Sequence, residues 1–67
     1  MKIIKKLRIN KNLTQKELAE KLMVTHQAVS KWENGETLPD ASILLELSSL
    51  LGTNVDILLR GGVYLFS

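Results

Sequence analysis

Several polar residues between positions 26 and 34 have side chains that could hydrogen-bond to nucleic-acid bases: His26, Gln27, Ser30, Lys31 and Asn34. A glutamine amide can pair with adenine through two hydrogen bonds, and a lysine ammonium can donate to guanine O6 and N7. At about 100° per residue, four of these residues fall on one side of a helical wheel and His26 lies on its flank. Any surface helix has a polar outward face, so this pattern alone favours nucleic-acid contact only weakly.

The opposite side of the same helix is apolar. Ala28, Val29 and Trp32 recur at a spacing typical of a buried helical face. Trp32 could instead use its indole N–H on DNA, but its apolar neighbours favour a place in the core. The element that carries the polar residues is therefore predicted to be an amphipathic helix.

Catalytic and metal chemistry have little support in the residue types. The chain has no cysteine and a single histidine, which excludes disulfides, cysteine-ligated zinc and histidine-rich metal sites. We recognise neither a nucleophile–base pair nor a phosphate-binding glycine loop. We therefore expect a protein that is not an enzyme and that needs no cofactor and no metal.

The net charge of +2 hides a division of the chain into a basic and an acidic part. Residues 1–31 hold eight lysines or arginines against two glutamates, a charge of +6, and residues 32–67 carry −4. Such a division can present a basic face to a polyanion, although a solvated lysine surface would give the same count.

The length of 67 residues allows one small domain, which buries only about 60% of its unfolded surface and gains from a partner. The N-terminus has no long apolar run of a signal peptide, and the apolar stretches are too short for a membrane helix. The absence of cysteine fits a reducing cytoplasm. We expect a cytoplasmic protein without a membrane segment.

Apolar spacing and capping signals predict a compact all-α domain of five helices, at about residues 2–10, 14–22, 25–34, 40–51 and 54–60. Thr14 and Glu17 form the pattern of a capping box. Thr25, Asp40 and either Thr53 or Asn54 are the other expected N-caps. The second and third predicted helices are separated by a short turn, as in a helix-turn-helix.

Three segments carry a family resemblance: Leu13–Leu22 (LTQKELAEKL), Val24–Gly35 (VTHQAVSKWENG) and Pro39–Asp40 with Leu50–Gly52. Over about residues 3–60 the chain closely resembles the Cro/lambda-repressor type, or xenobiotic-response-element type, of helix-turn-helix regulator. The resemblance implies a lambda-repressor-like fold whose third helix lies in the DNA major groove.

The resemblance also implies roles for individual residues. Base contacts are expected from the start of the third helix and one turn further on, at Thr25, His26, Gln27 and Lys31. Contacts to the DNA backbone are expected at Gln15, which would also support the third helix, and at Ser30 and Asn34. Lys31 could contact a base or a phosphate, and Ser30 could simply be solvated.

Arg8 is the only arginine before residue 60, in a region whose other cations are lysines. Its position toward the core side of the first helix suits a forked pair with a carboxylate, and Glu33 is the partner that the resemblance also indicates. The alternative is an arginine that contacts phosphate. Met23 departs from the family pattern, because the turn before the third helix usually carries glycine.

The C-terminal residues differ in kind from the rest, since two glycines precede a run of apolar residues. We divide the chain into a helix-turn-helix domain at 1–61 and a tail at 62–67, which could be a strand, a dimer contact or the stump of a longer chain. The residues expected at a dimer contact are Leu58, Leu59, Val63, Tyr64, Leu65 and Phe66.

Together these patterns predict a transcriptional regulator, by preference a repressor, that binds double-stranded DNA. We expect a homodimer on a pseudo-palindromic operator. The alternative is an antitoxin-like or other interaction module whose main ligand is a protein partner.

Overall fold

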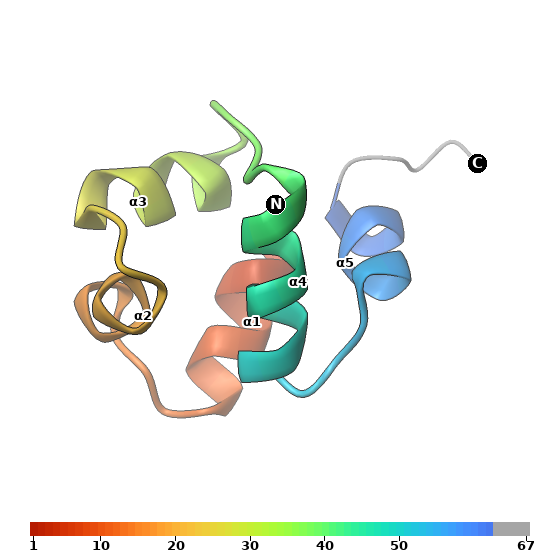
Figure 1. Cartoon of the computed structure of the whole chain (residues 1–67), viewed down its shortest axis with the longest axis horizontal. Helices are drawn as coiled ribbons and strands as arrows, with labels where there is room; N and C mark the ends of the chain where they lie inside the picture. Colours follow the sequence, from red (N-terminus) through yellow and green to blue (C-terminus); the bar gives the residue numbers. More distant parts are fainter. Residues whose placement is uncertain (63–67) are drawn as a thin grey trace.

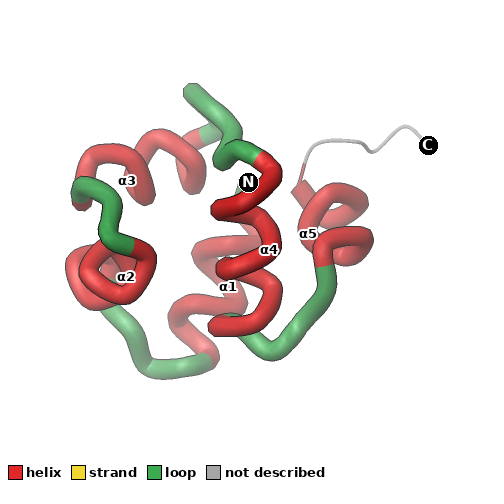
Figure 2. The backbone as a smooth tube through the Cα atoms, in the orientation of Figure 1, coloured by secondary structure: helices red, strands yellow, loops and turns green. Residues whose placement is uncertain are grey.

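The computed structural model describes residues 1–62, and these form five helices joined by short loops (Figure 1). The helices are α1 (Lys2–Asn10), α2 (Gln15–Leu22), α3 (His26–Asn34), α4 (Ala41–Leu50) and α5 (Val55–Gly62). In the view of Figure 1, α4 lies in front of α1 in the middle of the molecule, with α2 and α3 on one side and α5 on the other. Within the described range every regular element is a helix, as Figure 2 shows, which confirms the predicted all-α fold.

Side-chain caps begin four of these helices where the sequence predicts them. The Thr14 hydroxyl accepts from the Glu17 amide at 3.0 Å, and the Glu17 carboxylate accepts from the Thr14 amide at 2.8 Å, which completes the capping box. Thr25, Asp40 and Asn54 cap α3, α4 and α5 by accepting from backbone amides three residues further on. The predicted starts were therefore one residue early, because the capping residue itself lies outside the helix. The predicted end of α5 was early too, since the helix continues through both glycines to Gly62.

The core lies where α1, α2, α3 and α4 meet, and α5 closes it with one residue. Its buried members are Met1, Ile4, Leu18, Ala19, Leu22, Val29, Trp32, Leu47, Leu51 and Leu58. Trp32 is 5% exposed, so the interpretation of this tryptophan as a core residue is confirmed. Because α3 contributes both Val29 and Trp32, the core fixes which side of α3 is left for solvent.

The burial of Leu58 contradicts one prediction. We expected this leucine at a dimer contact, but it is fully buried against the rest of the monomer and leaves no surface for a second copy. The helical spacing could not distinguish these roles, since a residue on the apolar face of an end helix can pack on its own domain or on a partner. Leu59 is half-buried, and the other residues of the expected contact, 63–66, lie outside the described part of the chain.

The turn between α2 and α3 keeps the left-handed residue that the motif requires, although Met occupies the position. Met23 has φ 60° and ψ 41°, and the Val24 amide donates to the Ala19 carbonyl at 3.0 Å, as is usual after a left-handed cap. The Met23 side chain is 91% exposed, so it gains almost no packing in return. The strain of a β-carbon in this conformation is therefore uncompensated.

Met23→Gly is expected to raise the melting temperature. The substitution removes about 1–2 kcal/mol of left-handed strain, while the greater freedom of glycine in the unfolded chain cancels about 0.5–1 kcal/mol of that gain. The remainder corresponds to about 4 °C in a domain of this size. Asn12 has φ 59° and is the matched control, because asparagine visits this region readily and Asn12→Gly should gain less. An unchanged or lower melting temperature for Met23→Gly would contradict the strain at the turn.

Candidate nucleic-acid interface

The side of α3 that faces away from the core is polar and open to solvent. Thr25, His26, Gln27, Lys31 and Asn34 are exposed. Ser30, which was predicted with them, is half-buried at the edge of this face. The Thr25 hydroxyl caps α3, since its Oγ1 accepts from the Ala28 amide at 3.1 Å. The Thr25 methyl group is therefore the part of the side chain that remains for other contacts.

An ion pair fixes α3 to α1 beneath this face. Arg8 and Glu33 are 8% and 7% exposed, and the guanidinium binds the carboxylate through two bonds, Nε–Oε2 at 2.7 Å and Nη2–Oε1 at 3.1 Å. The remaining Arg8 nitrogen, Nη1, donates to the Leu13 carbonyl at 2.7 Å. The residue types thus match the forked geometry that arginine provides and lysine does not.

Glu33 is ionised at neutral pH in spite of its burial. Burial alone would raise the pKa of Glu33, but hydrogen bonds from Arg8 and Gln15 and the charges of Arg8 and Lys5 outweigh burial and lower this pKa below its ordinary value. The folded pKa is therefore below that of the unfolded chain. Stability from this group is present above the unfolded value and is lost as the pH falls through the folded one.

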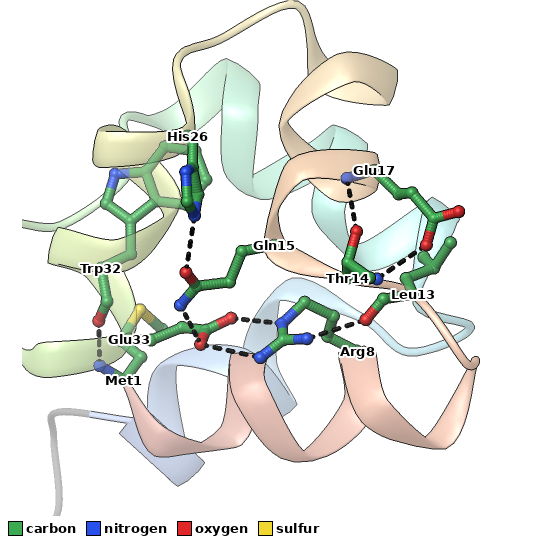
Figure 3. Close-up of polar contacts among 9 residues, drawn as sticks. All are labelled: Met1, Arg8, Leu13, Thr14, Gln15, Glu17, His26, Trp32 and Glu33. Atoms are coloured by element: carbon green, nitrogen blue, oxygen red, sulfur yellow. Dashed lines mark hydrogen bonds and ion pairs between the residues drawn. The ribbon is translucent and has the colours of Figure 1, made fainter.

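Gln15 connects the ion pair to the start of α3, as Figure 3 shows. Its Nε2 donates to Glu33 Oε1 at 2.9 Å, and its Oε1 lies 2.9 Å from His26 Nε2. Because a carboxylate only accepts, the Gln15 amide must turn its oxygen toward His26, and His26 Nε2 must carry the hydrogen. In a neutral His26, Nδ1 is then the ring nitrogen that can accept a hydrogen bond.

The sequence indicated part of this chain of contacts, the Arg8–Glu33 pair and a supporting role of Gln15 for the third helix. It did not indicate the bonds that join Gln15 to Glu33 and to His26, since His26 was assigned only a base contact. Gln15 begins α2 and His26 begins α3, and only the angle at which the two helices cross brings their side chains together. The structure does not bring Lys31 into this chain of contacts, since none of its polar bonds involves the Lys31 side chain.

The comparisons with known proteins identify the family of the chain. A family model described as helix-turn-helix matches residues 4–58, so the chain belongs to the helix-turn-helix family. This confirms the resemblance to the Cro/lambda-repressor type and the lambda-repressor-like fold expected from it.

Curated relatives are named as transcriptional regulators. The chain is 43% identical over 58 residues to the "HTH-type transcriptional activator BcrR" of Enterococcus faecalis, covering 87% of this chain and 28% of that protein. It is 40% identical over 58 residues to the SPbeta prophage-derived regulator YonR of Bacillus subtilis, covering 87% and 54%. The "26 kDa repressor protein" of Escherichia phage HK022 is 49% identical over 39 residues, covering 58% and 17%.

The chain spans about half of these relatives' length or less, so the similarity concerns the helix-turn-helix part. No solved structure matches the chain. Among the helices of the described part, none is both long and apolar enough to cross a membrane.

Proposed function

We propose that this protein binds double-stranded DNA in a sequence-specific manner and regulates transcription in the cytoplasm, with α3 in the major groove. The observation that carries this proposal is the exposed polar face of α3, which the Arg8–Glu33 pair and Gln15 hold in a defined orientation. The α-helix is the element that fits the major groove, and its donors and acceptors can match base edges there.

Within this face we assign base contacts to Thr25, His26, Gln27 and Lys31. Gln27 is the first candidate, because its amide is exposed, sits in the first turn of α3 and takes part in none of the side-chain bonds described above. We assign backbone contacts to Gln15, Ser30 and Asn34. Such contacts set the register and affinity of the complex, while the base contacts set its sequence preference.

We further propose that two copies bind a pseudo-palindromic operator, with the two α3 helices about one turn of DNA apart. After the correction at Leu58, the proposed dimer contact retains Leu59 and residues 63–66. A repressor role follows the name of the phage HK022 relative, while the name of the Enterococcus relative is that of an activator. Both roles use the same contact of α3 with DNA.

Selection of bound sequences from a random DNA pool tests the proposal. We expect enrichment of one motif in two inverted copies, with half-site centres about 10 base pairs apart. A single unpaired motif would support DNA reading without the dimer. A pool that stays unenriched at moderate salt would contradict sequence-specific binding and would favour a protein ligand.

A further inference from the structure

A shallow hollow lies between α1 and the C-terminal end of α3, outside the face to which base contacts are assigned. Its lining residues are Lys2, Lys5, Lys6, Ile9, Glu33 and Asn34. Four of these come from α1, where positions 2, 5, 6 and 9 share one side of the helix because they are three or four residues apart. The fold thus gathers three lysines around one depression.

The hollow is positively charged in spite of its glutamate. Both carboxylate oxygens of Glu33 already accept hydrogen bonds, Oε2 from Arg8 and Oε1 from Arg8 and Gln15. The Arg8 charge offsets that of Glu33, so the lysines are left without a counter-ion within the lining. Lys5, an exposed residue of the lining, lies close enough to Glu33 for its charge to help lower the pKa of that carboxyl.

Asn34 joins the hollow to the proposed DNA surface. It is the last residue of α3, it is exposed, and it lies on the same side of α3 as Gln27 and Lys31. Its side-chain amide can donate to an anion that the lysines attract. A DNA strand that follows the exposed face of α3 would therefore meet the lysines of α1 next.

We propose that this hollow binds one phosphodiester group of the DNA backbone, so that α1 adds a contact to those of α2 and α3. The inference rests on the proposed DNA binding. The lysine ammonium groups supply charge and the Asn34 amide supplies a directed hydrogen bond, which is the combination that protein contacts to phosphate commonly use. The apolar side of Ile9 forms part of the wall and offers no competing acceptor.

The test measures how the affinity of the full chain for a random-sequence duplex depends on salt, between about 50 and about 200 mM KCl. A variant with Lys2→Gln, Lys5→Gln and Lys6→Gln is expected to reduce the slope of log K against log salt by about 0.9, the loss of one phosphate contact. Lys11→Gln is the matched control for a single charge, because the Lys11 ammonium lies beside Gly52 at the other end of α1. A single Lys5→Gln should reduce the slope more than Lys11→Gln does. Thermal melts of all variants establish that they fold.

Equal slopes of log K against log salt in the parent and the triple variant would overturn the proposal. An equal reduction of this slope in Lys5→Gln and Lys11→Gln would overturn it as well. A titration with inorganic phosphate, followed at the Asn34 side-chain amide by NMR, distinguishes the alternative ligand. If phosphate binding is lost in the triple variant while the DNA slope is unchanged, the hollow takes free phosphate and the assignment to DNA is wrong. If the parent fails to bind any duplex at low salt, the proposed function itself is wrong. If the parent binds but the triple variant has the same slope, only the phosphate contact at the hollow is wrong.

Discussion

Arg8→Met is expected to lower the free energy of unfolding by about 3–5 kcal/mol, because it leaves the buried Glu33 carboxylate without its ion-pair partner. A small domain has only about 5–15 kcal/mol of stability in total, so the variant should lose a large part of it and melt at a much lower temperature than the parent. Denaturant melts followed by circular dichroism measure the loss. Arg8→Lys should be intermediate, since one ammonium cannot make the two bonds at 2.7 and 3.1 Å.

The chain contains a matched control for this substitution. Arg60 and Asp56 form an ion pair at 3.1 Å whose side chains are 78% and 69% exposed. Arg60→Met should therefore cause little measurable loss, because water screens an exposed pair. Comparable losses for Arg8→Met and Arg60→Met would contradict the structural role of the buried pair.

A fall in pH should change the contribution of Glu33 to stability in opposite directions in the parent and in Arg8→Met. In the parent, the lowered pKa of Glu33 means that its contribution to stability declines as the pH falls. Without Arg8, burial dominates and raises the folded pKa of Glu33 above its unfolded value. Stability then increases as the pH falls toward 4.5, the ordinary value for this group, because protonation removes the unpaired charge. The difference between the melting temperatures of the parent and of Arg8→Met should therefore decrease as the pH falls toward 4.5.

Gln27→Ala is expected to reduce discrimination at one base pair of the bound site by about 1–3 kcal/mol, or about 5- to 150-fold. The side chain is exposed, so the melting temperature should hardly change. The measurement compares the affinities of the parent and the variant for the selected site and for the same site with each base pair replaced in turn. The parent should lose affinity when the base pair contacted by Gln27 is replaced. The affinity of the variant should be the same for every base pair at that position.

Glu46→Ala serves as the control, because Glu46 is an exposed residue of α4 to which no DNA contact is assigned. A Gln27→Ala variant that weakens binding equally on every sequence would contradict base reading and would indicate a backbone contact. If the variant keeps the base preference of the parent at every position, the assignment of a base contact to Gln27 is wrong.

The local features of this fold could be predicted from the sequence, because they depend on neighbours along the chain. Thr14 with Glu17, Thr25 and Asp40 begin helices through bonds to amides three residues further on, and residue type reveals such bonds. The buried side of α3 followed from the spacing of its apolar residues. The predicted end of the last helix at residue 60, just before the two glycines, was wrong, since glycine weakens a helix without forbidding it.

The features that depend on how helices cross could not be predicted in the same way. Gln15, Glu33 and His26 meet because α2, α3 and α1 pack at particular angles, and no spacing along the chain encodes those angles. Leu58 was assigned to the wrong partner for the same reason, since its apolar character fits a monomer core and a dimer contact equally. The lysines of α1 were counted as part of a basic half, but only the structure places them beside Asn34.

The central claim is that DNA lies against the exposed face of α3, and backbone amide NMR during titration with a duplex carrying the selected site tests it most directly. We expect the largest shifts at the start of α2 and along α3, at Gln15, His26, Gln27 and Lys31. Small shifts are expected in α5, which lies on the far side of the molecule from α3 (Figure 1). Large shifts concentrated in α4 and α5, with α3 unchanged, would contradict the account.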